Sequence, residues 1–110
     1  MQGTMTPQQL MKVTKALADP TRFQLLQTIA GRGETCCGEL VRQFPLAQPT
    51  ISRHLKVLAE AGLVEVRREG QFNYYRMLRE VLDQYHQALD AALRGEGVRD
   101  AAPSAQQEAL

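Results

Sequence analysis

The sequence has no tryptophan, and its 110 residues include only three phenylalanines and three tyrosines. Aromatic packing is therefore scarce, and a chain of this length has a small hydrophobic core. No apolar run approaches the roughly 20 residues of a membrane-spanning helix. The first ten residues also lack the basic segment and apolar stretch that mark an export signal. These absences predict a cytoplasmic protein with no membrane partner.

Cysteine is rare as well, since the only two are the adjacent Cys36 and Cys37. Two neighbouring cysteines exclude the disulfide framework of a small secreted domain. We therefore expect both thiols to be reduced.

An excess of positive charge is also missing, because the formal net charge is +1. This excludes a protein held on nucleic acid by bulk charge alone. It leaves room for a local basic face, since residues 48–76 hold five basic and three acidic side chains, whereas residues 94–110 hold two basic and three acidic ones. The asymmetry predicts few phosphate contacts per subunit and hence a need for two subunits.

Helical patterns fill most of the chain. Apolar residues at helical spacing predict a first helix through residues 10–17. Asp19 followed by Pro20 predicts the start of a second helix, because aspartate caps helices and proline suits their first position. The apolar face of this helix is expected to contain Phe23, Leu26, Ile29 and Ala30, with glycines 31 and 33 ending it.

The remaining pattern predicts a short helix, a second longer helix, a hairpin and a last helix. Glu34 and Thr35 offer polar starts for a short helix that ends near Phe44, and residues 48–61 form the next helix. Alternation in 64–67 and 72–76 around a turn predicts a β-hairpin, and residues 79–93 return to helical spacing. This order predicts a mainly α fold with a β-hairpin wing, a winged helix-turn-helix over residues 1–94. Residues 95–110 are expected to be a flexible tail.

The helix over residues 48–61 carries the side chains that suit a DNA major groove. Glutamine pairs with adenine edges, arginine with guanine, and serine or threonine with bases or phosphate. The candidates on this helix are Gln48, Thr50, Ser52, Arg53, His54 and Lys56. A solvated polar face would look similar, but the hairpin that follows favours DNA. Its candidate DNA contacts are Arg67, Arg68, Gln71 and Arg76, although basic residues also protect exposed edge strands.

Several motifs in a fixed order resemble the ArsR/SmtB family. They are residues 17–22 (LADPTR), 48–58 (QPTISRHLKVL), 61–64 (AGLV), 68–70 (REG) and 74–76 (YYR). The resemblance implies a homodimeric repressor that binds double-stranded operator DNA and leaves it when an effector binds or a thiol is modified. It also implies a dimer interface of the first and last helices, which here carry Leu10, Val13, Leu17, Leu82, Tyr85, Leu89 and Leu93. One departure is Ala47, where the family often has a serine, so a helix cap is lost.

The cysteine pair is the candidate sensing site. Arsenic-sensing relatives often carry Cys-x-Cys here, and in this chain Gly38 stands at the second ligand position and Val41 at a third. Cys36 and Cys37 remain a candidate chelate for As(III) or another thiophilic metal, with no cofactor required. We slightly favour the hypothesis that oxidation of the two thiols is the signal. Adjacent Cα atoms lie about 3.8 Å apart, so a disulfide between them would be strained and easily reduced. The thiols are alternatively two small buried residues without a sensing role.

Other functions have less support. Asp83, His86 and Asp90 share the last helix, but zinc prefers more histidine or cysteine ligands, so a solvated face is the better interpretation. The two histidines belong to no catalytic motif, and no enzyme activity is expected. A winged-helix module that binds protein instead of DNA is the alternative of another class.

Overall fold

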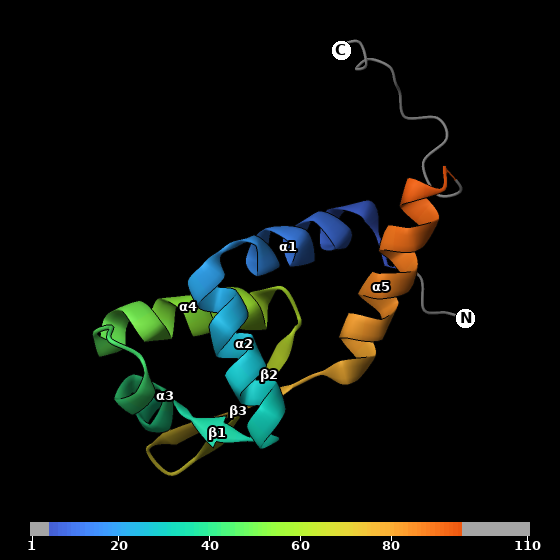
Figure 1. Ribbon diagram of the computed structural model, residues 1–110. Coiled ribbons are helices and arrows are strands. Elements are labelled where there is room, and N and C mark those ends of the chain that lie inside the picture. Colours follow the sequence, from blue (N-terminus) through green and yellow to red (C-terminus); the bar gives the residue numbers. More distant parts are fainter. Residues whose placement is uncertain (1–4, 96–110) are drawn as a thin grey trace.

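The computed structural model describes residues 5–95, and the predicted tail therefore lies outside the described residues except for Gly95. Five helices and one small sheet form the fold (Figure 1). The helices are α1 (Pro7–Ala18), α2 (Pro20–Arg32), α3 (Cys37–Gln43), α4 (Gln48–Glu60) and α5 (Arg79–Leu93). The expected mainly α fold with a β-hairpin wing is confirmed. No helix within residues 5–95 is long and apolar enough to cross a membrane.

The core lies where α2, α3 and α4 meet the sheet. Buried side chains come from every one of these elements and from α1, and the largest fully buried ones are Val13, Leu25, Ile29, Leu40, Ile51, Leu55, Leu58 and Leu63. The predicted inward face of α4 is confirmed, because its three apolar residues are completely buried. One stripe of a helix thus enters the core and leaves the opposite stripe exposed.

The buried face of α2 differs from the prediction. Phe23 is 45% exposed and Ala30 is exposed, whereas Leu25 is completely buried. The buried face is centred on Leu25, Leu26 and Ile29, because α2 packs against α1, α4 and the sheet at once. Periodicity identified two of these residues but placed the centre of the stripe too far to one side.

The junction between α1 and α2 follows the predicted capping chemistry. The Asp19 side chain accepts a hydrogen bond from the backbone N–H of Arg22 at 3.0 Å, and Pro20 begins α2. The Arg22 side chain turns back onto α1, where Nε donates to the carbonyl of Ala16 at 3.0 Å and Nη2 to that of Lys15 at 3.1 Å. These carbonyls lie in the last turn of α1, where helices lack partners of their own.

The sheet has three strands rather than the two of the predicted hairpin. β1 (Thr35–Cys36), β2 (Val64–Glu69) and β3 (Phe72–Met77) are antiparallel in the order β1-β3-β2. The prediction that Glu34 and Thr35 start a helix is therefore wrong. Thr35 pairs with Tyr75 and Cys36 with Tyr74, so long-range pairing with β3 overrides the local helical pattern. The short helix begins only at Cys37.

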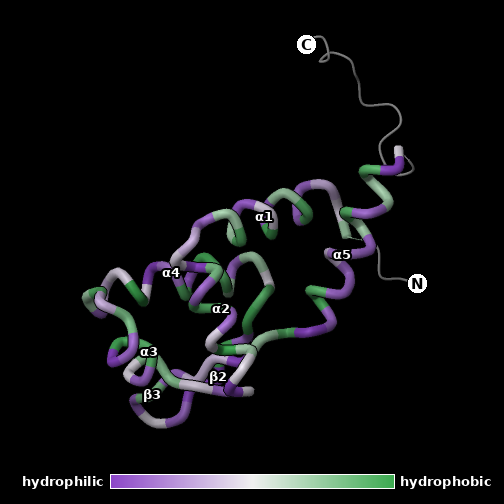
Figure 2. Tube along the Cα trace, viewed as in Figure 1, coloured by the Kyte–Doolittle hydropathy of each residue, from purple (hydrophilic) through white to green (hydrophobic). Residues whose placement is uncertain are grey.

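The last helix projects from one end of the domain beside α1 (Figure 1). It contains no buried residue in the single chain, although apolar and polar residues alternate along it at helical spacing (Figure 2). The hydroxyls of Tyr85 and Thr14 lie 2.8 Å apart and join α5 to α1. Most of the apolar stripe of α5 is thus only partly covered.

We expect Asp19→Ala to lower the midpoint of thermal unfolding by roughly 5 °C at pH 7, because the N-cap of α2 is lost. The backbone N–H of Arg22, followed by the charge of Arg22, holds the pKa of Asp19 below its ordinary value. A depressed carboxyl pKa stabilises the fold above roughly pH 4, and this stability is lost as the pH falls through the folded-state pKa.

Asp19→Asn is the matched control, because asparagine caps helices as well as aspartate but does not titrate. It is expected to stay close to the wild type at pH 7 and to show a flatter loss of stability below pH 4. Circular dichroism melts at one protein concentration provide the measurement. An equal midpoint for the alanine variant and the wild type would contradict the role of the cap.

Candidate nucleic-acid interface and thiol site

The outward stripe of α4 presents polar and basic side chains to solvent. Gln48, Ser52, Arg53 and Lys56 are exposed, opposite the stripe that enters the core. Within residues 5–95, neither Arg53 nor Lys56 forms an ion pair. These two cations are therefore available to an external anion. Ala47 supplies no side-chain cap to the start of α4, as expected for the missing hydroxyl.

Two other candidates on α4 are less exposed. Thr50 and His54 are half-buried. Nδ1 of His54 lies 3.5 Å from Nη1 of Arg22. The imidazole thus rests against the junction of α1 and α2, and His54 helps to position α4 as well as lining its surface.

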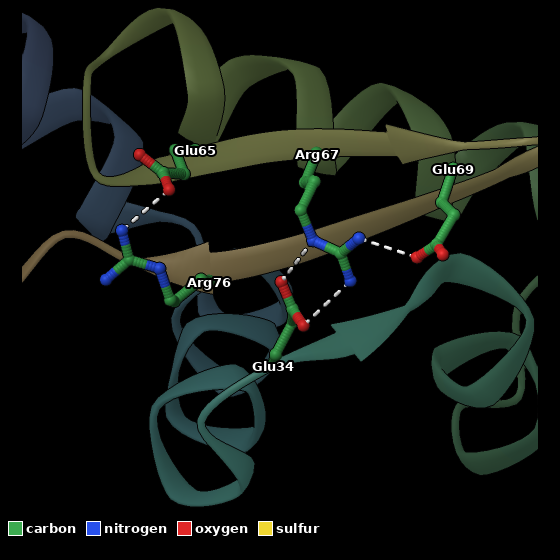
Figure 3. Close-up of polar contacts among 5 residues, drawn as sticks. All are labelled: Glu34, Glu65, Arg67, Glu69 and Arg76. Carbon is green, nitrogen blue, oxygen red and sulfur yellow. Dashed lines mark hydrogen bonds and ion pairs between the residues drawn. The ribbon is translucent and has the colours of Figure 1, made fainter.

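The arginines on the outer face of the wing are paired with carboxylates (Figure 3). Arg67 donates from Nε and Nη2 to the two oxygens of Glu34, each at 3.1 Å, and from Nη1 to Glu69 at 2.6 Å. Arg76 donates to Glu65 at 2.6 Å. These hydrogen bonds raise the pKa of Arg67 and Arg76, and the bond from Arg67 lowers the pKa of Glu34. Two of the predicted phosphate ligands are therefore already neutralised within the chain.

Arg68 differs from these two arginines. It follows Arg67 directly in β2, so its side chain points to the other face of the hairpin, and its Nε donates to the neutral side chain of Asn73 at 3.3 Å. No carboxylate within residues 5–95 pairs with it. Gln71 is exposed in the turn at the wing tip. Arg68 is thus the wing arginine whose charge is free for a phosphate.

A surface pocket of about 350 Å³ joins the thiols to both predicted DNA-contacting elements. Its walls come from the start of α3, from α4 and from the wing, and they include Cys36, Cys37, Gly38, Gln48, Ser52, Gln71, Phe72, Asn73 and Tyr75. Sγ of Cys37 lies 3.9 Å from Oγ of Ser52. Burial and then the nearby Cys37 raise the pKa of Tyr75. A chemical change at the thiols would therefore occur directly against α4 and β3.

Both cysteines are free and partly exposed. Within residues 5–95, no three side chains of histidine, cysteine, aspartate or glutamate gather closely enough to hold a metal ion. Asp83, His86 and Asp90 do line one open surface hollow on α5 together with Gln87. A thiophilic ion held by the described residues would thus have the two cysteines as its only thiolate ligands.

The residues predicted to form a dimer interface fall into two groups. Val13 is completely buried in the core of the single chain, so it offers no surface to a partner. Leu10, Leu17, Leu82 and Tyr85 are partly buried against that core, Leu89 is half-exposed, and Leu93 is 79% exposed. The uncovered part of the stripe therefore lies on the C-terminal half of α5.

Sequence reasoning missed two side chains that organise this region. Arg22 was part of a recognised motif but received no role, and Glu34 was predicted to start the short helix rather than to pair with the wing. For Arg22, the nearby Asp19 in the sequence was a local signal that could have identified its role. Nothing in the sequence pairs Glu34 with Arg67, which lies 33 residues further along the chain.

Comparisons with known proteins agree with this geometry. A family model described as a helix-turn-helix domain matches residues 17–67. The chain is 48% identical over 83 residues to the arsenic resistance transcriptional regulator ArsR1 of Pseudomonas putida, covering 76% of this chain and 62% of that protein. It is 36% identical over 86 residues to the arsenical resistance operon repressor of Staphylococcus xylosus, covering 78% and 82%.

Among solved structures, an ArsR-like transcriptional regulator from Rhodococcus sp. RHA1 superposes with a TM-score of 0.71 at 28% identity. The superposition covers 93% of this chain and 95% of that one. The likeness therefore extends over almost the whole described fold, including α1 and α5.

Proposed function

The chain belongs to the ArsR family of winged helix-turn-helix regulators, and on this basis we propose that it is a dimeric operator repressor released by chemistry at Cys36 and Cys37. A DNA-binding transcriptional regulator is the function that the family and the named relatives support. The observation that carries the proposal further is the shared pocket, in which both thiols adjoin Gln48 and Ser52 of α4.

DNA contact is assigned to the side chains that are exposed and free of internal ion pairs. Gln48, Ser52 and Arg53 read base edges from the N-terminal half of α4, the half that a recognition helix inserts into the major groove. Lys56 and Arg68 contact phosphates on either side of that groove. Thr50, His54 and Gln71 line the same surface, whereas Arg67 and Arg76 chiefly hold the wing together.

Dimerisation is assigned to α5 with the adjacent part of α1. A helix with one apolar stripe normally buries that stripe, yet α5 has no buried residue in the single chain. Leu89 and Leu93 continue the stripe beyond its contact with α1. A second copy of α5, related by two-fold symmetry, would cover the stripe and set two α4 helices in successive grooves.

Oxidation is the first proposed route of release. Peroxide accepts two electrons and the two thiol protons, the Cys36–Cys37 disulfide forms, and two waters leave. Cys36 has extended backbone angles in β1 (φ −102°, ψ 163°), while Cys37 begins α3. A disulfide between neighbouring residues is strained, so its formation would have to change the backbone where β1 passes into α3. Because α3 and β3 adjoin it, the distortion would reach both sides of the DNA-binding surface.

Arsenite is the second candidate effector, and the names of the relatives favour it. Both curated relatives described above are named for arsenic or arsenical resistance. The two neighbouring thiols supply two sulfur ligands, and displacing Ser52 from Cys37 would disturb α4. This route and oxidation use the same residues, so one set of variants tests both.

The wing assignment predicts that Arg68→Ala weakens operator binding over a range of sequences. A plot of log K for operator binding against log salt concentration has a negative slope, and losing one phosphate contact makes this slope shallower by about 1 per subunit. Arg94→Ala is the matched control and should keep the wild-type slope, because Arg94 caps the C-terminal end of α5, and that end of the helix lies far from the wing (Figure 1). Fluorescence anisotropy with the promoter of the protein's own gene measures both. Absence of salt-dependent binding by the wild type would favour the protein-binding module instead.

The interface assignment predicts that Leu93→Asp converts dimers to monomers without unfolding the chain. Leu93 is 79% exposed, so the charge costs the single chain little, whereas a dimer would have to bury it. Gln87→Glu adds the same charge to the exposed side of α5 and should remain dimeric. Light scattering after gel filtration gives the masses. A wild-type chain that is monomeric at every concentration would refute the assignment.

The thiol assignment predicts that peroxide and As(III) each lower the operator affinity of the reduced protein by about tenfold or more, equal to 1.4 kcal/mol per factor of ten. The variant with both cysteines replaced by serine should bind the operator normally and respond to neither reagent. Dithiothreitol should reverse the peroxide effect. Release of this double variant by either reagent, or no release of the wild type by both, would overturn the assignment.

A further inference from the structure

Glu34 is the residue just before β1, and its carboxylate reaches across the sheet to the outermost strand. Arg67 of β2 donates two hydrogen bonds to it from Nε and Nη2, both at 3.1 Å (Figure 3). Paired hydrogen bonds of this kind fix direction as well as distance. The sheet order β1-β3-β2 places the whole width of β3 between the two residues. Glu34 therefore joins the segment that precedes the thiols to the far strand of the wing.

A row of residues connects one of the thiols to the same arginine. Cys36 is in register with Tyr74, and Tyr74 is in register with Arg67. Residues directly opposite each other in a sheet share a face, so these three side chains lie side by side across the three strands. The guanidinium of Arg67 lies 4.7 Å from the centre of the Tyr74 ring. Arg67 is thus held by the carboxylate of Glu34 and by the ring of Tyr74, which is in register with Cys36.

The strand that anchors this arrangement is only weakly held. β1 has two residues, and the hydroxyl of Thr35 is buried without a hydrogen-bond partner within residues 5–95. An unpaired buried hydroxyl costs free energy. A covalent constraint on Cys36 and Cys37 therefore acts on a strand that has little stability of its own.

We propose that Glu34 is the positioning residue of the wing: through Arg67 it holds the hairpin against β1, so that modification of the thiols loosens the wing. Loosening of the wing agrees with release of DNA, because a loosened hairpin no longer presents Arg68 at a fixed place. This inference rests on the proposed function, in which Cys36 and Cys37 are the sensor. It adds a second connection between the thiols and the proposed DNA-binding surface, independent of the contact between Cys37 and Ser52.

Hydrogen exchange of the wing amides, residues 64–77, tests the proposal in the absence of DNA. In the reduced protein, Glu34→Gln should speed exchange in the wing about threefold. Peroxide treatment, with disulfide formation checked by intact mass, should speed wing exchange in the wild type and add little in Glu34→Gln. When Glu69→Gln also removes the carboxylate that would repel a glutamate at position 67, the combination of Glu34→Arg with Arg67→Glu should recover part of the protection and its sensitivity to peroxide.

Glu65→Gln is the matched control. It removes the same charge from the same face and breaks the ion pair with Arg76, but that pair joins β2 only to β3. Its wing should therefore respond to peroxide as strongly as that of the wild type. If peroxide leaves the thiols reduced, methyl methanethiosulfonate transfers an S–CH3 group to each cysteine sulfur, which forms a mixed disulfide and releases methanesulfinate, and the same comparisons apply.

Two results would overturn the proposal. One is an equal response to thiol modification in Glu34→Gln and the wild type. The other is a wild-type wing whose exchange is unchanged after modification. Operator binding by the same samples separates this failure from failure of the proposed function. If thiol modification still releases the operator but wing exchange does not change, only the role of Glu34 is refuted. If the reduced wild type binds no operator at all, the proposed repressor function is refuted, and the exchange data still decide the role of Glu34.

Discussion

The arrangement of the helices depends on the hydrogen bonds made by Arg22. Its side chain satisfies two carbonyls in the last turn of α1, and its backbone N–H is capped by Asp19 at the start of α2. Its guanidinium also lies against His54 of α4. One residue therefore contacts three helices at the point where two of them end or begin. Because α1 also packs on α5, this junction relates α4 to the helix that carries the uncovered apolar stripe.

A net charge near zero is compatible with DNA binding because of how the charges are distributed. On the outer face of the wing, Glu34, Glu65 and Glu69 surround Arg67 and Arg76, so these arginines add little to the external field. The cations without such partners in the described chain include Arg53 and Lys56 on α4 and Arg68 on the wing. Unlike Arg67 and Arg76, these three cations keep their charge available to an external anion. Pairing within the chain thus leaves fewer cations available to DNA than the count of basic residues indicates.

The parts of the fold predicted correctly from the sequence depend on neighbours in the chain. The cap at Asp19, the buried stripe of α4 and the hairpin are local patterns, and the structure contains each of them. Thr35 and Cys36 were assigned to a helix because their strand partners lie about 40 residues away and leave no local signal. The same reason hides the pairing of Glu34 with Arg67. Leu25 was missed on α2 because three neighbours bury that helix, which moves the centre of its apolar face.

The site itself was predicted as a set of residue types, but their proximity was not. The two cysteines lie where β1 ends and α3 begins, so adjacent residues point toward different parts of the molecule. Cys37 lies near Ser52 on α4, and Cys36 is in register with Tyr74 of the wing. A reaction that joins the two sulfurs must change the backbone between a strand and a helix. Since one of these elements packs on α4 and the other pairs with β3, the adjacency of the cysteines allows a single reaction to act on both surfaces proposed to contact DNA.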